Sequence, residues 1–195
     1  KPSGEFVLGP GHSFTFEGWF FVGKLQGPVF LLGTRTGEVT GGRGWHLDLR
    51  PPERGRSARQ MSFFYDSGQK KTQALAEEVW VADKKSHHFA VVWDHDYSVE
   101  SGEMRLFLDG VQVASNSLPH EGLSIKQSNP FRVGAKGNPA KLALDELRFS
   151  HRALAPHEFL LSGAVVGVRM IKSDEENHNS WLETENWEEG KLPSG

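Results

Sequence analysis

An acidic residue in an otherwise apolar segment raises the first chemical question in this sequence. In "LALDELRFS" (142–150), strict strand alternation places Asp145 on one face with Leu147 and Phe149. A carboxylate on that core-like face needs a compensating partner. Hydrogen bonds from backbone or hydroxyl groups could supply it, and so could an arginine. Bound calcium is a third alternative, because Ca²⁺ accepts carboxylate and carbonyl oxygens together. A β-bulge that turns Asp145 outward is the fourth.

The acidic residues do not form the pair that hydrolytic chemistry requires. Retaining glycoside hydrolysis uses two carboxyl groups about 5–5.5 Å apart. Glu17, Asp48 and Asp66 each stand alone in a strand-like segment, whereas Asp145 and Glu146 are neighbours that point in opposite directions. The sequence also lacks a nucleophile elbow, a phosphate-binding loop and a dinucleotide fingerprint. We therefore predict a protein that is not an enzyme and has no catalytic residues.

Two short motifs could bind a metal, but local structure explains each of them better. Asp94-His95-Asp96 flanks a histidine with acids, and we interpret it as a solvated turn, because aspartates cap turns through local hydrogen bonds. His87 and His88 are adjacent, so a strand would send them to opposite faces, one packed and one exposed. No histidine spacing typical of a zinc site occurs.

Aromatic and basic residues suggest a carbohydrate-binding site instead. Sugars stack their apolar faces on aromatic rings and form hydrogen bonds with polar side chains. Arg54 and Arg56 lie in a basic loop (50–59) that could contact an acidic glycan or an acidic partner, although a solvated loop is the simpler interpretation. The candidate stacking platforms are Trp45, Tyr65, Trp80 and Tyr97.

Short strand-like segments separated by turn residues must position these groups. The clearest is "GEMRLFLDGVQVAS" (102–115), in which apolar residues alternate on both sides of Asp109-Gly110, a hairpin signature. We interpret 73–85 as loop and strand, because Val79-Trp80-Val81 fits a strand edge. The pattern predicts an all-β, two-sheet antiparallel sandwich with one short helix near 155–161. The other expected strands are 5–9, 13–23, 28–34, 44–50, 61–66, 87–94, 131–137 and 141–150.

The bulk composition excludes several classes of partner. The chain has 195 residues and a net charge of −3, which provides no basic surface for nucleic acid or an anionic membrane. No apolar run approaches the roughly 20 residues of a membrane-spanning helix. With no cysteine, the fold cannot depend on disulfides. A chain of this length can instead be stabilised by a hydrophobic core.

Four segments in order carry a family resemblance. "FTFEGWF" (14–20), "SHHFAVVWD" (86–94), "GEMRLFLDGVQVAS" (102–115) and "LALDELRFSHRALAPHEF" (142–159) resemble strands of the concanavalin A-like lectin/glucanase superfamily, above all its laminin-G-like jelly-roll domains. One departure is Ser86, where the family usually has tryptophan. The resemblance covers about residues 5 to 162 and implies two antiparallel sheets packed face to face.

The same resemblance sets the functional expectation. It implies a non-catalytic recognition or adhesion module of a larger, bacterial, extracytoplasmic protein, whether secreted, on the cell surface or periplasmic. Such a module would bind carbohydrate or an extracellular protein through its sandwich loops, beside other domains of the same polypeptide. Calcium is a cofactor that this superfamily often carries. The alternatives are a glycoside hydrolase or lyase-like domain with a degenerate site, and an architectural spacer without a ligand.

A change of composition after Gly163 sets the expected domain boundary. Residues 1–163 are predicted to form the laminin-G-like sandwich. In 164–195, "AVVGVRMI" (164–171) could add a final strand, and the acidic, polar remainder is typical of a linker or of the start of a further module.

Overall fold

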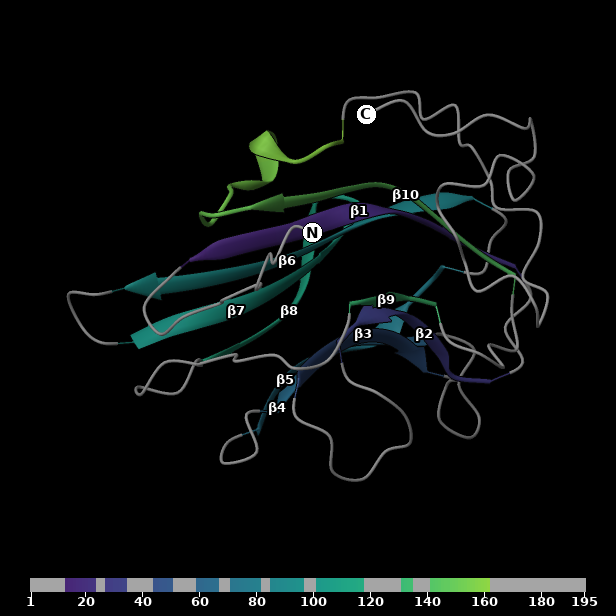
Figure 1. Ribbon diagram of the computed structural model, residues 1–195, viewed down its shortest axis with the longest axis horizontal. Coiled ribbons are helices and arrows are strands. Elements are labelled where there is room, and N and C mark those ends of the chain that lie inside the picture. Colours follow the sequence, from purple (N-terminus) through teal and green to yellow (C-terminus); the bar gives the residue numbers. More distant parts are fainter. Residues whose placement is uncertain are drawn as a thin grey trace, which may run out of the picture.

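The computed structural model describes residues 13–23, 27–34, 44–50, 59–66, 71–81, 85–96, 101–117, 131–134 and 141–161. They form two antiparallel five-stranded sheets that lie face to face as two layers (Figure 1). The first sheet has the order β10 (Leu142–Ser150), β1 (Phe14–Val22), β6 (Ser86–Asp96), β7 (Ser101–Leu108) and β8 (Val111–Ser117). The second has the order β5 (Lys71–Val79), β4 (Arg59–Asp66), β3 (Gly44–Arg50), β2 (Val29–Gly33) and β9 (Arg132–Val133). The predicted all-β sandwich is confirmed.

Alternate residues of the facing strands fill the space between the sheets. Phe14, Phe16 and Phe20 of β1 point inward and are no more than 7% exposed. From the second sheet, Trp45 of β3 meets Phe16 with ring centroids 5.8 Å apart. Burying each phenylalanine contributes about 1.5–3 kcal/mol to folding. The period-two pattern of β1 and β3 therefore fixes which face of each sheet is core.

The turn between β7 and β8 does more than reverse the chain. Asp109 and Gly110 have φ angles of 51° and 80°, the left-handed pair of a tight hairpin turn. The Asp109 carboxylate also accepts the backbone N–H of His88 at 2.8 Å and lies 2.7 Å from Nδ1 of His87. The predicted hairpin is confirmed, and its aspartate ties the turn to the start of β6.

A β-bulge in β10 changes the predicted position of Asp145. The register against β1 shifts at this point, and Glu146 adopts a φ of 47°. Leu144 before the bulge and Leu147 after it both pack on the core, so the alternation reverses between them. Asp145 pairs with Trp19 on the outer face, and its Oδ1 accepts the N–H of Glu146 at 2.8 Å. The prediction that Asp145 faces the core is wrong, and the bulge alternative describes its position.

Strand β6 corrects two further expectations. It continues to Asp96, so Asp94 is not in a turn; its carboxylate instead accepts a 2.7 Å hydrogen bond from Arg105 of β7. His87 and His88 do point to opposite faces, but both are buried, at 7% and 0% exposure. The predicted exposed histidine is therefore absent from this pair, because a later segment of the chain covers the outer side of β6.

Two further predicted elements are confirmed, and two predicted segments lie outside the described residues. Residues 71–79 form strand β5, and the short helix is a 3-10 turn, Pro156–Glu158, with proline at its first position. The expected strand at 5–9 and the whole of 164–195 lie outside the described residues. Across the described ranges, no helix has the length and apolar character to span a bilayer.

Candidate functional site

The sandwich has two outer faces, and the C-terminal segment covers one of them. Residues 151–161 pass over the outer side of the first sheet, with the 3-10 turn on the side away from the second sheet (Figure 1). Thr15 of β1 donates to the carbonyl of Arg152 and accepts the N–H of Leu154, both at 2.9 Å. Trp19 Nε1 donates to the carbonyl of Leu160 at 2.9 Å. We call this side the covered face.

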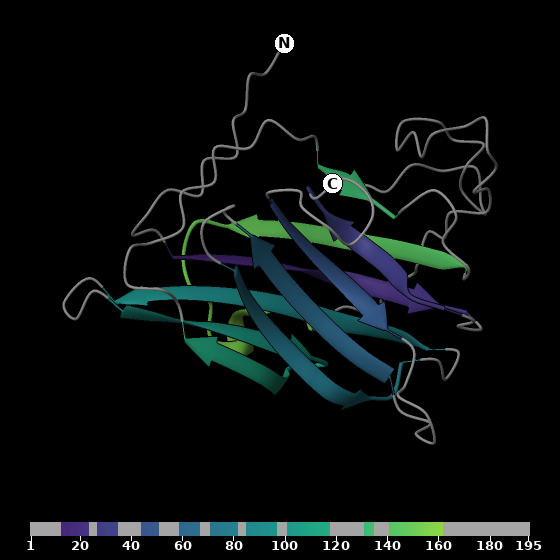
Figure 2. The same cartoon turned by 90° about the horizontal axis from the view of Figure 1, so that it is seen from below.

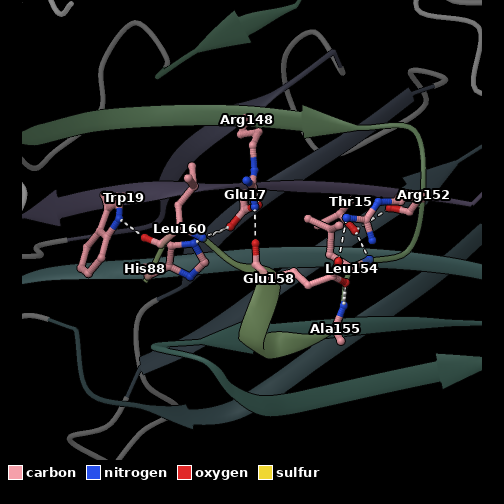
Figure 3. Close-up of polar contacts among 10 residues, drawn as sticks. All are labelled: Thr15, Glu17, Trp19, His88, Arg148, Arg152, Leu154, Ala155, Glu158 and Leu160. Atoms are coloured by element: carbon pink, nitrogen blue, oxygen red, sulfur yellow. Dashed lines mark hydrogen bonds and ion pairs between the residues drawn. The ribbon is translucent and has the colours of Figure 1, made fainter. Parts of the chain in front are cut away.

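A fully buried carboxylate lies at the centre of the covered face (Figure 3). Glu17 accepts hydrogen bonds from the N–H of Leu160 at 2.8 Å and from Nε of Arg148 at 2.7 Å. Nε2 of His88 lies 3.0 Å from Oε2 of Glu17, the oxygen that also accepts the Leu160 N–H. Nη2 of Arg148 is also paired with the carboxylate. These three residues, with the Leu160 backbone, form the Glu17 cluster.

The Glu17 cluster compensates its charge internally. Burial alone would raise the pKa of Glu17, but hydrogen bonds from His88, from the Leu160 N–H and from Arg148 outweigh it and lower the pKa below its ordinary value. Arg148 also donates to the carbonyl of Glu158 at 2.6 Å. The side chain of Glu17 is 0% exposed. The cluster therefore fastens the C-terminal segment to the sheet and offers no site for a substrate.

The compensated, buried acid is Glu17 of β1, whereas the sequence predicts one at Asp145 of β10. Glu17 was treated as an isolated strand acid, although alternation in β1 already placed it with Thr15 and Trp19, opposite the core phenylalanines. The missing information was the cover, because no local pattern shows that residues 151–161 return over that face. The one local indication of this cover is the apolar pair Leu154 and Phe159, both of which are buried against the sheet.

The other outer face belongs to the second sheet. Figure 2 turns this sheet toward the viewer, with β3, β4 and β5 crossing the near side. None of the described elements lies over it. We call it the open face. Its residues alternate with the core residues of β2 to β5 and include Phe30, His46, Asp48, Arg50, Gln60, Ser62, Phe64, Asp66, Gln73 and Leu75.

A row of rings crosses the open face. The His46 ring lies between Phe30 and Phe64, with centroid distances of 6.3 Å and 5.3 Å and interplanar angles near 30°. All three side chains keep part of their surface in solvent, unlike the rings of the core. The three rings come from β2, β3 and β4, and they form a row because these strands are neighbours in the sheet. The row is a preformed aromatic platform held by the sheet backbone.

A polar band lies beside the ring row. Arg50 Nε donates to Asp48 Oδ2 at 3.1 Å, and His46 Nε2 lies 3.7 Å from the same oxygen. Burial raises the pKa of Asp48 despite the opposing effects of Arg50 and the Ser62 hydroxyl, and Oδ1 is buried without a hydrogen-bond partner among the described residues. The Gln73 amide donates to Ser62 at 2.6 Å. Rings, amide, guanidinium and carboxylate together suit recognition of a hydroxyl-rich ligand.

The structure separates the predicted ligand-binding residues. Trp45 and Tyr65 belong to the core, at 6% and 1% exposure, and burial raises the pKa of Tyr65 to about 12. They cannot serve as platforms for a dissolved ligand, and this correction follows from their inward alternation in β3 and β4. Trp80 is 66% exposed at the end of β5. Tyr97, Arg54 and Arg56 lie outside the described residues.

The described residues contain no group of three or more histidine, aspartate or glutamate side chains that could hold a metal ion. Asp145 lies on the outer face of β10 and bonds to its own neighbouring N–H. Calcium binding at Asp145 stays a prediction, and a thermal melt with and without chelator tests it.

Comparisons with known proteins agree with this architecture. A family model described as the concanavalin A-like lectin/glucanases superfamily matches residues 2–159. The carbohydrate-binding module CBM40 of a Ruminococcus gnavus IT-sialidase superposes with a TM-score of 0.55 at 15% identity, covering 76% of this chain and 81% of that one. A search of curated proteins found no match.

Two structures of a botulinum neurotoxin binding domain are similar in fold. The DC serotype domain, solved in one case with SialylT and in another with rat synaptotagmin II, gives TM-scores of 0.55 at 8% identity. The match covers 75% of this chain and 34% of the toxin domain, so this chain spans about a third of that relative's length. These neighbours are binding domains, and at such low identity the likeness shows the fold alone.

Proposed function

Because this chain belongs to the concanavalin A-like lectin/glucanase superfamily, we propose that it is a non-catalytic recognition module that binds carbohydrate on the open face. The module would act within a larger extracytoplasmic protein, beside other domains of the same polypeptide. The sequence pointed to the sandwich loops as the contact region. The proposal moves the contact to the sheet surface formed by β2, β3, β4 and β5.

The aromatic platform beside hydrogen-bonding groups carries this proposal. Phe30, His46 and Phe64 offer ring surface on a rigid sheet, and a preformed platform costs little conformational entropy on binding. Arg50 and Gln73 supply donors beside the rings. Rings interleaved with polar groups match a sugar, which has both apolar faces and hydroxyl edges.

The enzymatic alternative has less support on this face. Asp48 contacts a guanidinium, an imidazole and a hydroxyl, and no second carboxylate among the described residues. Asp66, on the next strand, pairs with Lys71 at 3.5 Å. Hydrolysis by a carboxylate pair requires two acids at a set separation across the substrate. A degenerate hydrolase site would need its second acid from elsewhere in the chain.

A glycan array tests the proposed function directly. The wild-type protein should bind a defined subset of glycans, and Phe64→Ala should lose most of that signal, because the variant removes one ring of the platform. The Glu103→Gln variant, which changes a half-exposed acid on the first sheet, is the control and should bind like wild type. Thermal melts confirm that both variants are folded. Binding that survives Phe64→Ala in full would reject the open face as the site.

A further inference from the structure

Trp80 is an exposed aromatic ring on a fixed piece of backbone. Its neighbours Val79 and Val81 are buried in the core at 2% and 0% exposure, whereas Trp80 itself is 66% exposed. The two valines hold the backbone on both sides, so the indole projects from an anchored position. A single exposed apolar side chain is ordinary on a protein surface, so the case for Trp80 depends on where it lies relative to the ring row.

Burial of its neighbours places Trp80, the residue directly after β5, on the side of the open face. A register shift lies between Ala76 and Val79, so the core side of the chain changes from even to odd positions there. Val79 and Val81 belong to the core, and Trp80 between them points outward, as Gln73 and Leu75 do before the shift. Gln73 pairs with Phe64 at the ring row, whereas Val79 pairs with Arg59 near the opposite end of β4. With a rise of about 3.3 Å per residue, Trp80 lies roughly 20 Å along the strand from the ring row.

Polar side chains and one leucine occupy the interval between the two aromatic positions, and Ser62 among them is fully buried. The register pairs Ser62 with Leu75 and Asp48, and then Gln60 with Arg50, moving along the strands away from the ring row. Arg50 keeps 39% of its side chain in solvent. The open face therefore presents rings, then a band of hydrogen-bonding groups, then a second ring.

From this order we propose that the ligand is an extended, multi-unit saccharide lying along the strands, with Trp80 as a second stacking subsite. The inference rests on the proposed carbohydrate-binding function and specifies its ligand class. A single terminal sugar would stack on part of the ring row and leave Trp80 unused. An internal stretch of a longer chain can contact both aromatic positions and the polar band between them, which raises affinity without new protein elements.

Isothermal titration calorimetry with one saccharide at several lengths tests the inference. The probe is the strongest glycan from the array together with its own fragments, from one unit to the full chain. Wild-type affinity should rise with length until the chain spans the face. Trp80→Ala should weaken the affinity for the full-length saccharide about tenfold, the equivalent of one aromatic contact. Its affinity for the shortest binding fragment should equal that of wild type. Val111→Ala, which truncates an equally exposed side chain on β8 of the other sheet, should match wild type throughout.

Three results would overturn the proposal. If the shortest fragment binds as tightly as the full chain, or if Trp80→Ala binds the full chain like wild type, the second subsite is wrong while carbohydrate binding stands. If wild type binds no glycan on the array, the proposed function and this inference fall together. Trp80→Ala should melt like wild type, because the removed ring is largely in solvent.

Discussion

The two outer faces of the sandwich carry similar acidic and basic side chains, but these have a structural role on one face and a proposed binding role on the other. On the covered face, Glu17 and His88 are buried under residues 151–161, and the partly exposed Arg148 pairs with Glu17 from the edge. On the open face, Asp48 and Arg50 form a looser contact beside partly exposed rings. The comparison teaches that a buried, well-paired acid indicates structure here. Groups left with capacity for an outside partner are the better guide to function.

The pKa shifts of the buried Glu17 and the partly buried Asp48 go in opposite directions. Hydrogen bonds on the covered face lower the pKa of Glu17 below its ordinary 4.5, despite burial. On the open face burial prevails, and the pKa of Asp48 rises above its ordinary 3.8. The folded state therefore favours the ionised form of Glu17 and the neutral form of Asp48. Acids held at a cost to stability are enriched at functional sites.

Loss of the Glu17 charge should have the largest effect on stability. Glu17→Gln leaves Arg148 and His88 without their carboxylate. Breaking a fully buried ion pair costs about 3–5 kcal/mol, and the 36% exposure of Arg148 lowers the expected cost to about 2–3 kcal/mol. Urea unfolding at pH 7 measures the change. Glu103→Gln on the same sheet, a half-exposed acid 3.9 Å from Arg105, should unfold close to wild type. Equal stability of the two variants would remove the structural role assigned to the Glu17 cluster.

The pH dependence of stability should separate the two faces by sign. The lowered pKa of Glu17 gives stability that is present above pH 4.5 and is lost as the pH falls through the folded-state pKa. The deficit of Glu17→Gln should therefore shrink in acid. The raised pKa of Asp48 makes its ionised form unfavourable once the pH rises above 3.8, so Asp48→Asn should gain relative to wild type from acid to neutral pH.

Unfolding free energies of both variants and wild type, measured in steps between pH 3 and pH 7, test this contrast. The two difference curves should slope in opposite directions. Curves that slope in the same direction would mean that the two acids experience similar environments.

Sequence patterns predicted the layers and strands because period-two alternation and turn chemistry are local. Alternation in β3 was sufficient to send Trp45 inward and His46, Asp48 and Arg50 outward, so the open face could have been found from the same pattern that predicted the core. The same alternation puts Trp45 and Tyr65, two of the predicted platforms, in the core.

Non-local features could not be settled from the sequence, although a bulge at Asp145 was among the alternatives. The bulge at Glu146 depends on the pairing of β10 with β1, and it moves Asp145 to the outer face. The burial of His88 depends on a segment more than sixty residues later in the chain, which covers β6. Neither feature has a signature within the strand that it alters.

Chemical-shift mapping by NMR tests the central claim most directly. Titrating ¹⁵N-labelled protein with the strongest array glycan should shift the backbone amides of His46, Asp48, Phe64 and Gln73, with those of Glu17 and His88 unchanged. Saturable binding that shifts the covered face and leaves β3, β4 and β5 unperturbed would contradict the assignment of the two faces.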